Sequence, residues 1–150
     1  MVAANLAADV FVNDPIFYRP LYRFLLGVGD ALQRPAFLQR SLEFWQRAIG
    51  ELMDAVPVAQ ALRSGGLARM LMMNFLAALE LWVHHELDHE QFRAQVRYGA
   101  AMLLHGFASE KQRTSLMRQM RACERRLPSA FSLITADGPS ASLTPREAAQ

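Results

Sequence analysis

The chain has 150 residues, of which 52% are hydrophobic and 20% are charged, and its formal net charge at pH 7 is +2. This composition excludes a largely disordered chain, and the length suits one hydrophobic core rather than two. The single cysteine, Cys123, excludes an internal disulfide framework, which favours a reducing, cytoplasmic location. The most apolar run, residues 70–79, is too short to span a bilayer, and the first residues lack a basic secretory start. We therefore expect neither membrane insertion nor export.

Helical spacing of apolar residues predicts the first half of the fold. Asp14 followed by Pro15 is typical of a helix start, and the first helix is expected over residues 15–28. Pro20 should kink or restart this helix, because proline removes one intrahelical hydrogen bond. A second helix is expected over residues 35–56, where apolar side chains recur at steps of three and four.

The middle of the chain predicts a central helix. A short helical piece over residues 58–63 is expected to lead into a breaker at residues 64–66, Ser-Gly-Gly. Residues 67–85 then carry apolar side chains almost all the way round a helix. This pattern is typical of a helix surrounded by the rest of the domain.

Two capping boxes predict where the last two helices begin. They start at Asp88 and Ser109, each followed three residues later by a glutamine. Strand-like alternation is nearly absent, so the fold is predicted to be all-α. We expect a single helical-bundle domain of five to six helices over residues 1–127. Residues 128–150 are rich in Ser, Ala, Pro and Gly and are expected to form a flexible tail.

The sharpest local motif is His85-Glu-Leu-Asp-His89, which matches H-E-x-x-H. In that motif two imidazoles one turn apart on a single helix hold zinc. Asp88, however, is the best helix cap of this region and would break the helix between the two histidines. We interpret the segment as a polar junction between helices and keep a zinc hydrolase as an alternative. A nucleophile elbow and a phosphate loop are both absent from the sequence, so no enzyme activity and no cofactor are expected.

Methionine and aromatic residues give a softer indication of ligand binding. Adaptable, polarizable side chains suit either a filled core, which is the default interpretation, or a cavity for apolar ligands. Asn74 is an amide inside the most apolar helix and would need a polar partner if it were buried. The candidate ligand-binding residues are Tyr22, Trp45, Met70, Met73, Asn74 and Trp82.

The order of these signals resembles the C-terminal, effector-binding domain of TetR-family transcriptional regulators. Residues 13–21, NDPIFYRPL, are similar to the family's entry into its fifth helix. Residues 81–92, LWVHHELDHEQF, are similar to its recurrent helix-restart turn, with His85 where glycine is usual. Residues 98–109, YGAAMLLHGFAS, are similar to the start of its last helix pair. The resemblance covers residues 10–127.

This resemblance implies a homodimer. In the family, the last two helices pair with the same two helices of a second subunit in a four-helix bundle, which assigns the dimer surface to residues 88–127. A stripe of glycine and alanine on the first of these helices agrees with a close helix approach. The expected interface residues are Phe92, Val96, Gly99, Ala100, Leu103, Leu116, Met120, Cys123 and Leu127.

The resemblance also implies a small apolar effector that binds among the middle helices and causes release of a DNA operator, as in a bacterial repressor. Only about a dozen residues precede the first expected helix, whereas a helix-turn-helix domain needs roughly 50. We therefore expect DNA binding only through an N-terminal domain that this chain does not contain. The remaining alternative is a plain helical dimerisation module with a filled core and no ligand.

Overall fold

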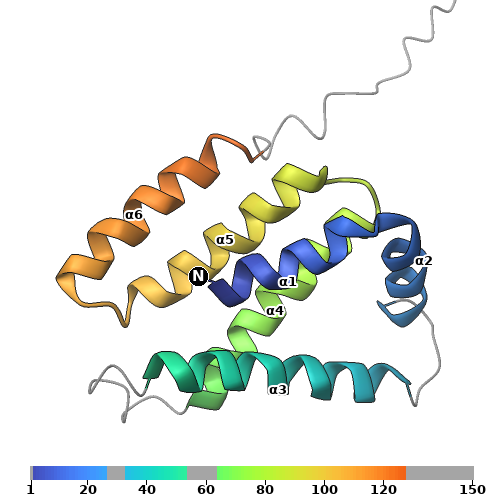
Figure 1. Ribbon diagram of the computed structural model, residues 1–150, viewed down its shortest axis with the longest axis horizontal. Helices are drawn as coiled ribbons and strands as arrows, with labels where there is room; N and C mark the ends of the chain where they lie inside the picture. Colours follow the sequence, from blue (N-terminus) through green and yellow to red (C-terminus); the bar gives the residue numbers. More distant parts are fainter. Residues whose placement is uncertain (1, 27–32, 54–63, 128–150) are drawn as a thin grey trace, which may run out of the picture.

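A computed structural model describes residues 2–26, 33–53 and 64–127, and these residues form six α-helices (Figure 1). No strand occurs in the described ranges, which confirms the all-α prediction. In chain order the helices are α1 (Val2–Asn13), α2 (Pro15–Leu26), α3 (Gln33–Met53), α4 (Ser64–Val83), α5 (His89–His105) and α6 (Glu110–Glu124).

Helix α4 is the core helix, as its all-round apolar pattern predicts. It packs against α2, α3 and α5, and Figure 1 shows it passing behind α1 and crossing α3. Leu79, Trp82 and Val83 of α4 are among the most completely buried large side chains, together with Phe92 and Val96 of α5. Helix α6 lies at the edge of the molecule, alongside α5.

Part of α4 also meets a simple test for a membrane-spanning helix. Gly65–Val83 is long and apolar enough, with a mean hydropathy of 1.3, and this segment extends beyond the short apolar run expected from the sequence. Half of it is buried inside the fold. A central helix of a globular domain has the same length and composition, and the packing of α2, α3 and α5 around α4 accounts for them here.

Helix α1 was not expected from the sequence. It lies along α5, and it buries Ala4 and Ala8 while leaving an apolar stripe exposed. A polar contact strengthens this packing, because the Arg93 guanidinium donates to the Asp9 carboxylate over 2.8 Å. The hydrogen bond to the Asp9 carboxylate is the largest influence on the pKa of Arg93 and raises it. Desolvation, the second influence, acts in the opposite direction, and the net effect is a raised pKa. The exposed apolar residues of the stripe are Val2, Leu6 and Val10.

Three details of the first four helices correct the sequence prediction. Helix α2 continues through Pro20, because the loss of one hydrogen bond does not end a helix that packs on its neighbours. Helix α3 begins at Gln33, which places Pro35 in the first turn, where proline is tolerated. The Ser-Gly-Gly segment forms the first turn of α4 instead of a breaker. The expected helical piece at 58–63 and the expected tail at 128–150 lie outside the described residues.

Candidate functional site

The junction between α4 and α5 is built around a residue in the left-handed backbone conformation. His85 has φ 64°, the only positive φ at a non-glycine position among the described residues. The Glu86 amide donates to the Leu81 carbonyl over 2.9 Å, and the His85 amide donates to the Trp82 carbonyl over 3.2 Å. These two bonds form a Schellman motif, in which a left-handed residue ends a helix and satisfies its last carbonyls. Glycine adopts this conformation without strain, whereas the Cβ atom of histidine makes it energetically unfavourable, so His85 destabilises the backbone locally.

The next helix starts on the predicted capping box. The Asp88 carboxylate accepts the Gln91 amide over 2.8 Å, and the Gln91 side-chain oxygen accepts the Asp88 amide over 2.9 Å. Ser109 uses Gln112 similarly at the start of α6, where the Ser109 amide donates to the Gln112 side chain over 2.9 Å. Both predicted helix starts are therefore confirmed, and the chain stops and restarts its helix between Val83 and His89.

This break removes the geometry that the zinc alternative needs. His85 lies in the turn and His89 is the first residue of α5, so the two imidazoles do not share one continuous helix. The guanidinium of Arg19 also lies against the His85 ring, 2.6 Å from Nδ1 and 3.4 Å from Nε2, so its positive charge opposes a metal cation there. In the described ranges no group of three or more His, Cys, Asp or Glu side chains is arranged to hold a metal ion.

Arg19 connects α2 to this junction. Its guanidinium lies 4.6 Å from the centroid of the buried Trp82 ring, a cation–π contact, and Nη1 donates to Nδ1 of His85 over 2.6 Å. The Nε atom of Arg19 is buried without a hydrogen-bond partner in the described part of the chain. Arg19 is thus held in place by the rings of Trp82 and His85, and it forms no ion pair with a carboxylate of the described residues.

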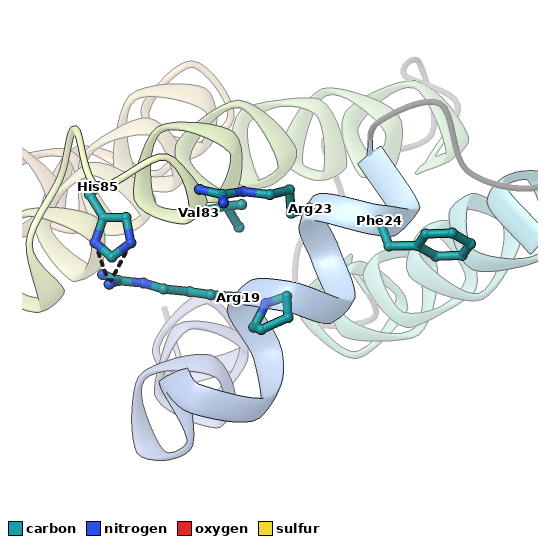
Figure 2. Close-up of a pocket in the computed structure, with 6 residues that line it drawn as sticks. Arg19, Arg23, Phe24, Val83 and His85 are labelled. Carbon is teal, nitrogen blue, oxygen red and sulfur yellow. Dashed lines mark hydrogen bonds between the residues drawn. The ribbon is translucent and has the colours of Figure 1, made fainter.

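A pocket of about 410 Å³ opens beside this arginine, between α2 and the end of α4. Figure 2 shows the side chains of Arg19 and Arg23 leaving α2 one turn apart and extending in the same direction, toward the turn that carries His85. The ring of Phe24 points away from the two guanidinium groups. The residues that line the pocket are Arg19, Pro20, Arg23, Phe24, Val83 and His85.

The candidate ligand residues do not converge on this pocket. Trp45 and Trp82 are 3% and 0% exposed and belong to the hydrophobic core, and Tyr22 packs there against the ring of Phe11, with centroids 4.8 Å apart. These three side chains fill the interior. In contrast, the remaining two apolar candidates point outward from α4, since Met70 and Met73 are each 55% exposed.

Asn74, the polar candidate, is half-buried against α5. Its side chain lies over Gly99, in the space that a Cβ atom at position 99 would occupy. The close helix approach predicted at Gly99 is therefore present, but the partner helix is α4 of the same chain. Gly99 accommodates the Asn74 amide here. This packing explains the glycine at position 99 and the amide at position 74 without a bound ligand.

Most of the expected dimer-interface residues are already buried within the chain's own fold. Phe92, Val96 and Ala100 are at most 2% exposed and belong to the same core as α4. Because the chain's own helices cover these side chains, they offer no area to a second subunit in this fold. The α6 positions Leu116, Met120 and Cys123 are also buried, at 8 to 9% exposure. Of the nine expected residues, Leu103 and Leu127 remain partly exposed.

Sequence reasoning missed most of the residues that line the pocket. His85 was considered as part of the zinc motif and of the helix-restart turn but not as a pocket residue, and Arg19 and Arg23 were not singled out. Their spacing of four residues is a signal that both side chains lie on one face of a helix. This spacing does not predict the position of α4, and it is the end of α4 that brings Val83 and His85 next to the two arginines.

Comparisons with known proteins do not identify the chain. No family model matches it, and searches of curated proteins and of solved structures found no match.

Proposed function

We propose that the chain is the ligand-binding and dimerisation domain of a TetR-like transcriptional regulator. The observation that carries this proposal is the left-handed turn at His85, which ends the central helix and restarts the chain as α5 at the position where the resemblance expects a glycine-type turn. The order of six helices, with α4 surrounded and α5 and α6 adjacent, supports the same proposal.

Dimerisation in this proposal uses the outer surfaces of α5 and α6. The inner stripe is occupied, but Met102 and Met117 are 56% and 39% exposed, and Leu103 is partly exposed. Exposed large apolar side chains on an adjacent helix pair are a suitable centre for a symmetric interface. Operator binding is assigned to an N-terminal domain that the six described helices do not provide.

Sedimentation velocity tests the dimer. We expect the chain to sediment as a dimer, and the double substitution Met102→Glu with Met117→Glu to convert it to a monomer, because two charges would have to be buried in the interface. Ile16→Glu is the matched control, since Ile16 is 87% exposed on α2. A monomeric wild-type chain, or equal dissociation of both variants, would contradict the proposal.

The filled interior favours a second candidate function, a dimerisation module without an effector. Trp45, Trp82 and Phe75 are buried and in aromatic contact with neighbouring rings, which leaves the core packed where the effector is expected. Melting temperature in the presence of a panel of apolar compounds separates the two functions, because a ligand of the folded state raises it by mass action. If no compound in the panel raises the melting temperature, the result favours the dimerisation module without an effector.

A further inference from the structure

The pocket beside α2 concentrates positive charge without a matching carboxylate. Arg19 and Arg23 are one turn apart, and neither forms an ion pair with any acidic residue in the described ranges. The carboxylate of Glu80, one turn before the pocket residue Val83, lies instead 3.3 Å from Nε2 of His84. Like charges four residues apart on a helix destabilise it, and an anion between them would remove that repulsion.

The two arginines differ in their contacts and exposure, and this difference suits binding of a ligand. Arg19 is fixed between the Trp82 ring, at 4.6 Å, and Nδ1 of His85, at 2.6 Å. Arg23 is exposed, and Figure 2 shows its guanidinium extending on the same side as that of Arg19. One guanidinium is therefore preorganised, and the second is able to close on an anion that the first has received. Guanidinium groups donate paired hydrogen bonds that match a carboxylate.

Apart from His85, the other pocket residues are apolar. Pro20 and Phe24, which is 54% exposed, offer apolar surface next to the arginines, whereas Val83 is only 1% exposed and offers almost none. A volume of about 410 Å³ is within the range of small-molecule sites, about 300–1,000 Å³. A site of this kind favours a ligand with a charged end and a compact apolar body over a simple inorganic ion.

We propose that this pocket binds a small organic carboxylate whose apolar body packs against Pro20 and Phe24 while its carboxylate lies between Arg19 and Arg23. The site is distinct from the buried candidate residues of the core. It also goes beyond the proposed regulator function, because binding here requires neither a dimer nor an operator. A monomeric chain that still binds the carboxylate would refute the proposed dimer and leave this site intact.

Titration calorimetry with phenylacetate tests the site. We expect saturable binding of one phenylacetate per chain, at least about tenfold tighter than that of phenylacetamide, its neutral analogue, since a charged acceptor strengthens hydrogen bonds to guanidinium. Acetate, which lacks the apolar body, and inorganic phosphate should each bind at least about tenfold more weakly. Phosphate as tight as phenylacetate, or phenylacetamide as tight as phenylacetate, would overturn the proposal, and so would the absence of saturable binding.

Two variants locate the binding. Arg23→Gln should weaken phenylacetate binding about tenfold, because one charged donor is lost from an exposed position that the fold does not depend on. Arg118→Gln, an exposed arginine on α6, is the matched control and should bind as the wild type does. Arg19→Lys keeps the charge but loses the planar donor pair and should weaken binding as well. Equal affinity of the Arg23 and Arg118 variants would place the ligand elsewhere and refute the site.

Discussion

The side chain of Asn74 on α4 occupies the space that a Cβ atom at Gly99 on α5 would fill. The two helices therefore approach through a glycine on one side and a short amide on the other. Small residues at a helix crossing allow close interaxial approach and larger buried contacts around it. This contact lies beside the buried residues Val96 and Ala100, so it helps fix α5 on the core.

Substitution Gly99→Ala is expected to destabilise the protein. In an open helical position the change from glycine to alanine stabilises by about 1 kcal/mol. At position 99 the added methyl group overlaps the Asn74 side chain, and we expect a net loss of about 1 kcal/mol in the free energy of unfolding. Urea denaturation measures the loss. Gly50→Ala on α3 is the control, because a Cβ there meets no atom within 4 Å, and it should stabilise the protein.

A double-mutant cycle tests whether Asn74 causes this loss. In the Asn74→Ala background the space above position 99 is open, so Gly99→Ala should become stabilising by up to about 1 kcal/mol. The coupling between the two sites is then about 2 kcal/mol, within the range found for residues in contact. Additive effects of the two substitutions would show that another part of the fold excludes the methyl group.

The left-handed turn gives a second prediction. His85→Gly should be more stable than His85→Ala by about 1 kcal/mol, because both lose the contact with Arg19 and only alanine keeps the strain of φ 64°. Thermal or urea unfolding of the pair measures the difference. The same comparison at Ala77, exposed within α4, should have the opposite sign, with glycine the less stable. A common sign at both positions would contradict the left-handed assignment.

The sequence was sufficient for the features that depend on local chemistry. Both capping boxes and the break before His89 were predictable, because each depends on side chains within four residues of a backbone amide. The central position of α4 followed from its all-round apolar pattern. Helix α1 was missed because half of its buried residues, Ala4 and Ala8, are small and do not mark a strong apolar stripe.

Features that depend on which helix covers which face were not predictable. The stripe containing Phe92 and Val96 was correctly expected to be buried, but periodicity does not distinguish cover by α4 of the same chain from cover by a second subunit. The same limit applies to the pocket, where residues 19 and 85 meet across 66 positions of sequence. Apolar spacing says that a face is buried, and the tertiary arrangement decides what buries it.

The start of α5 provides a third prediction. Asp88→Ala should lower the free energy of unfolding by about 1 kcal/mol, because the Gln91 amide loses its acceptor. Asp88→Asn should cost less, since an amide oxygen still accepts that bond. Ser109→Ala should also cost less, because the Ser109 hydroxyl donates to the Gln112 side chain over 2.8 Å and does not accept a helix amide as the Asp88 carboxylate does. Urea denaturation of the three variants gives the order, and equal losses for Asp88→Ala and Asp88→Asn would refute the capping role.

Stability at high pH should report on Tyr22, whose phenol is buried in the aromatic core. Burial, followed by the neighbouring Tyr18, raises the pKa of Tyr22 from 10.0 to about 12. The unfolded chain therefore loses this proton at lower pH than the folded chain, so the stabilisation is complete below pH 10 and is lost as the pH rises toward about 12.

Urea midpoints measured from about pH 9 to about pH 12 should fall less steeply in Tyr22→Phe than in the wild type. Tyr98→Phe is the comparison for a phenol outside the core, whose pKa is raised chiefly by the hydrogen bond that its hydroxyl donates to Glu124 over 3.2 Å. An unchanged slope in Tyr22→Phe would mean that the phenol is not held neutral by the core.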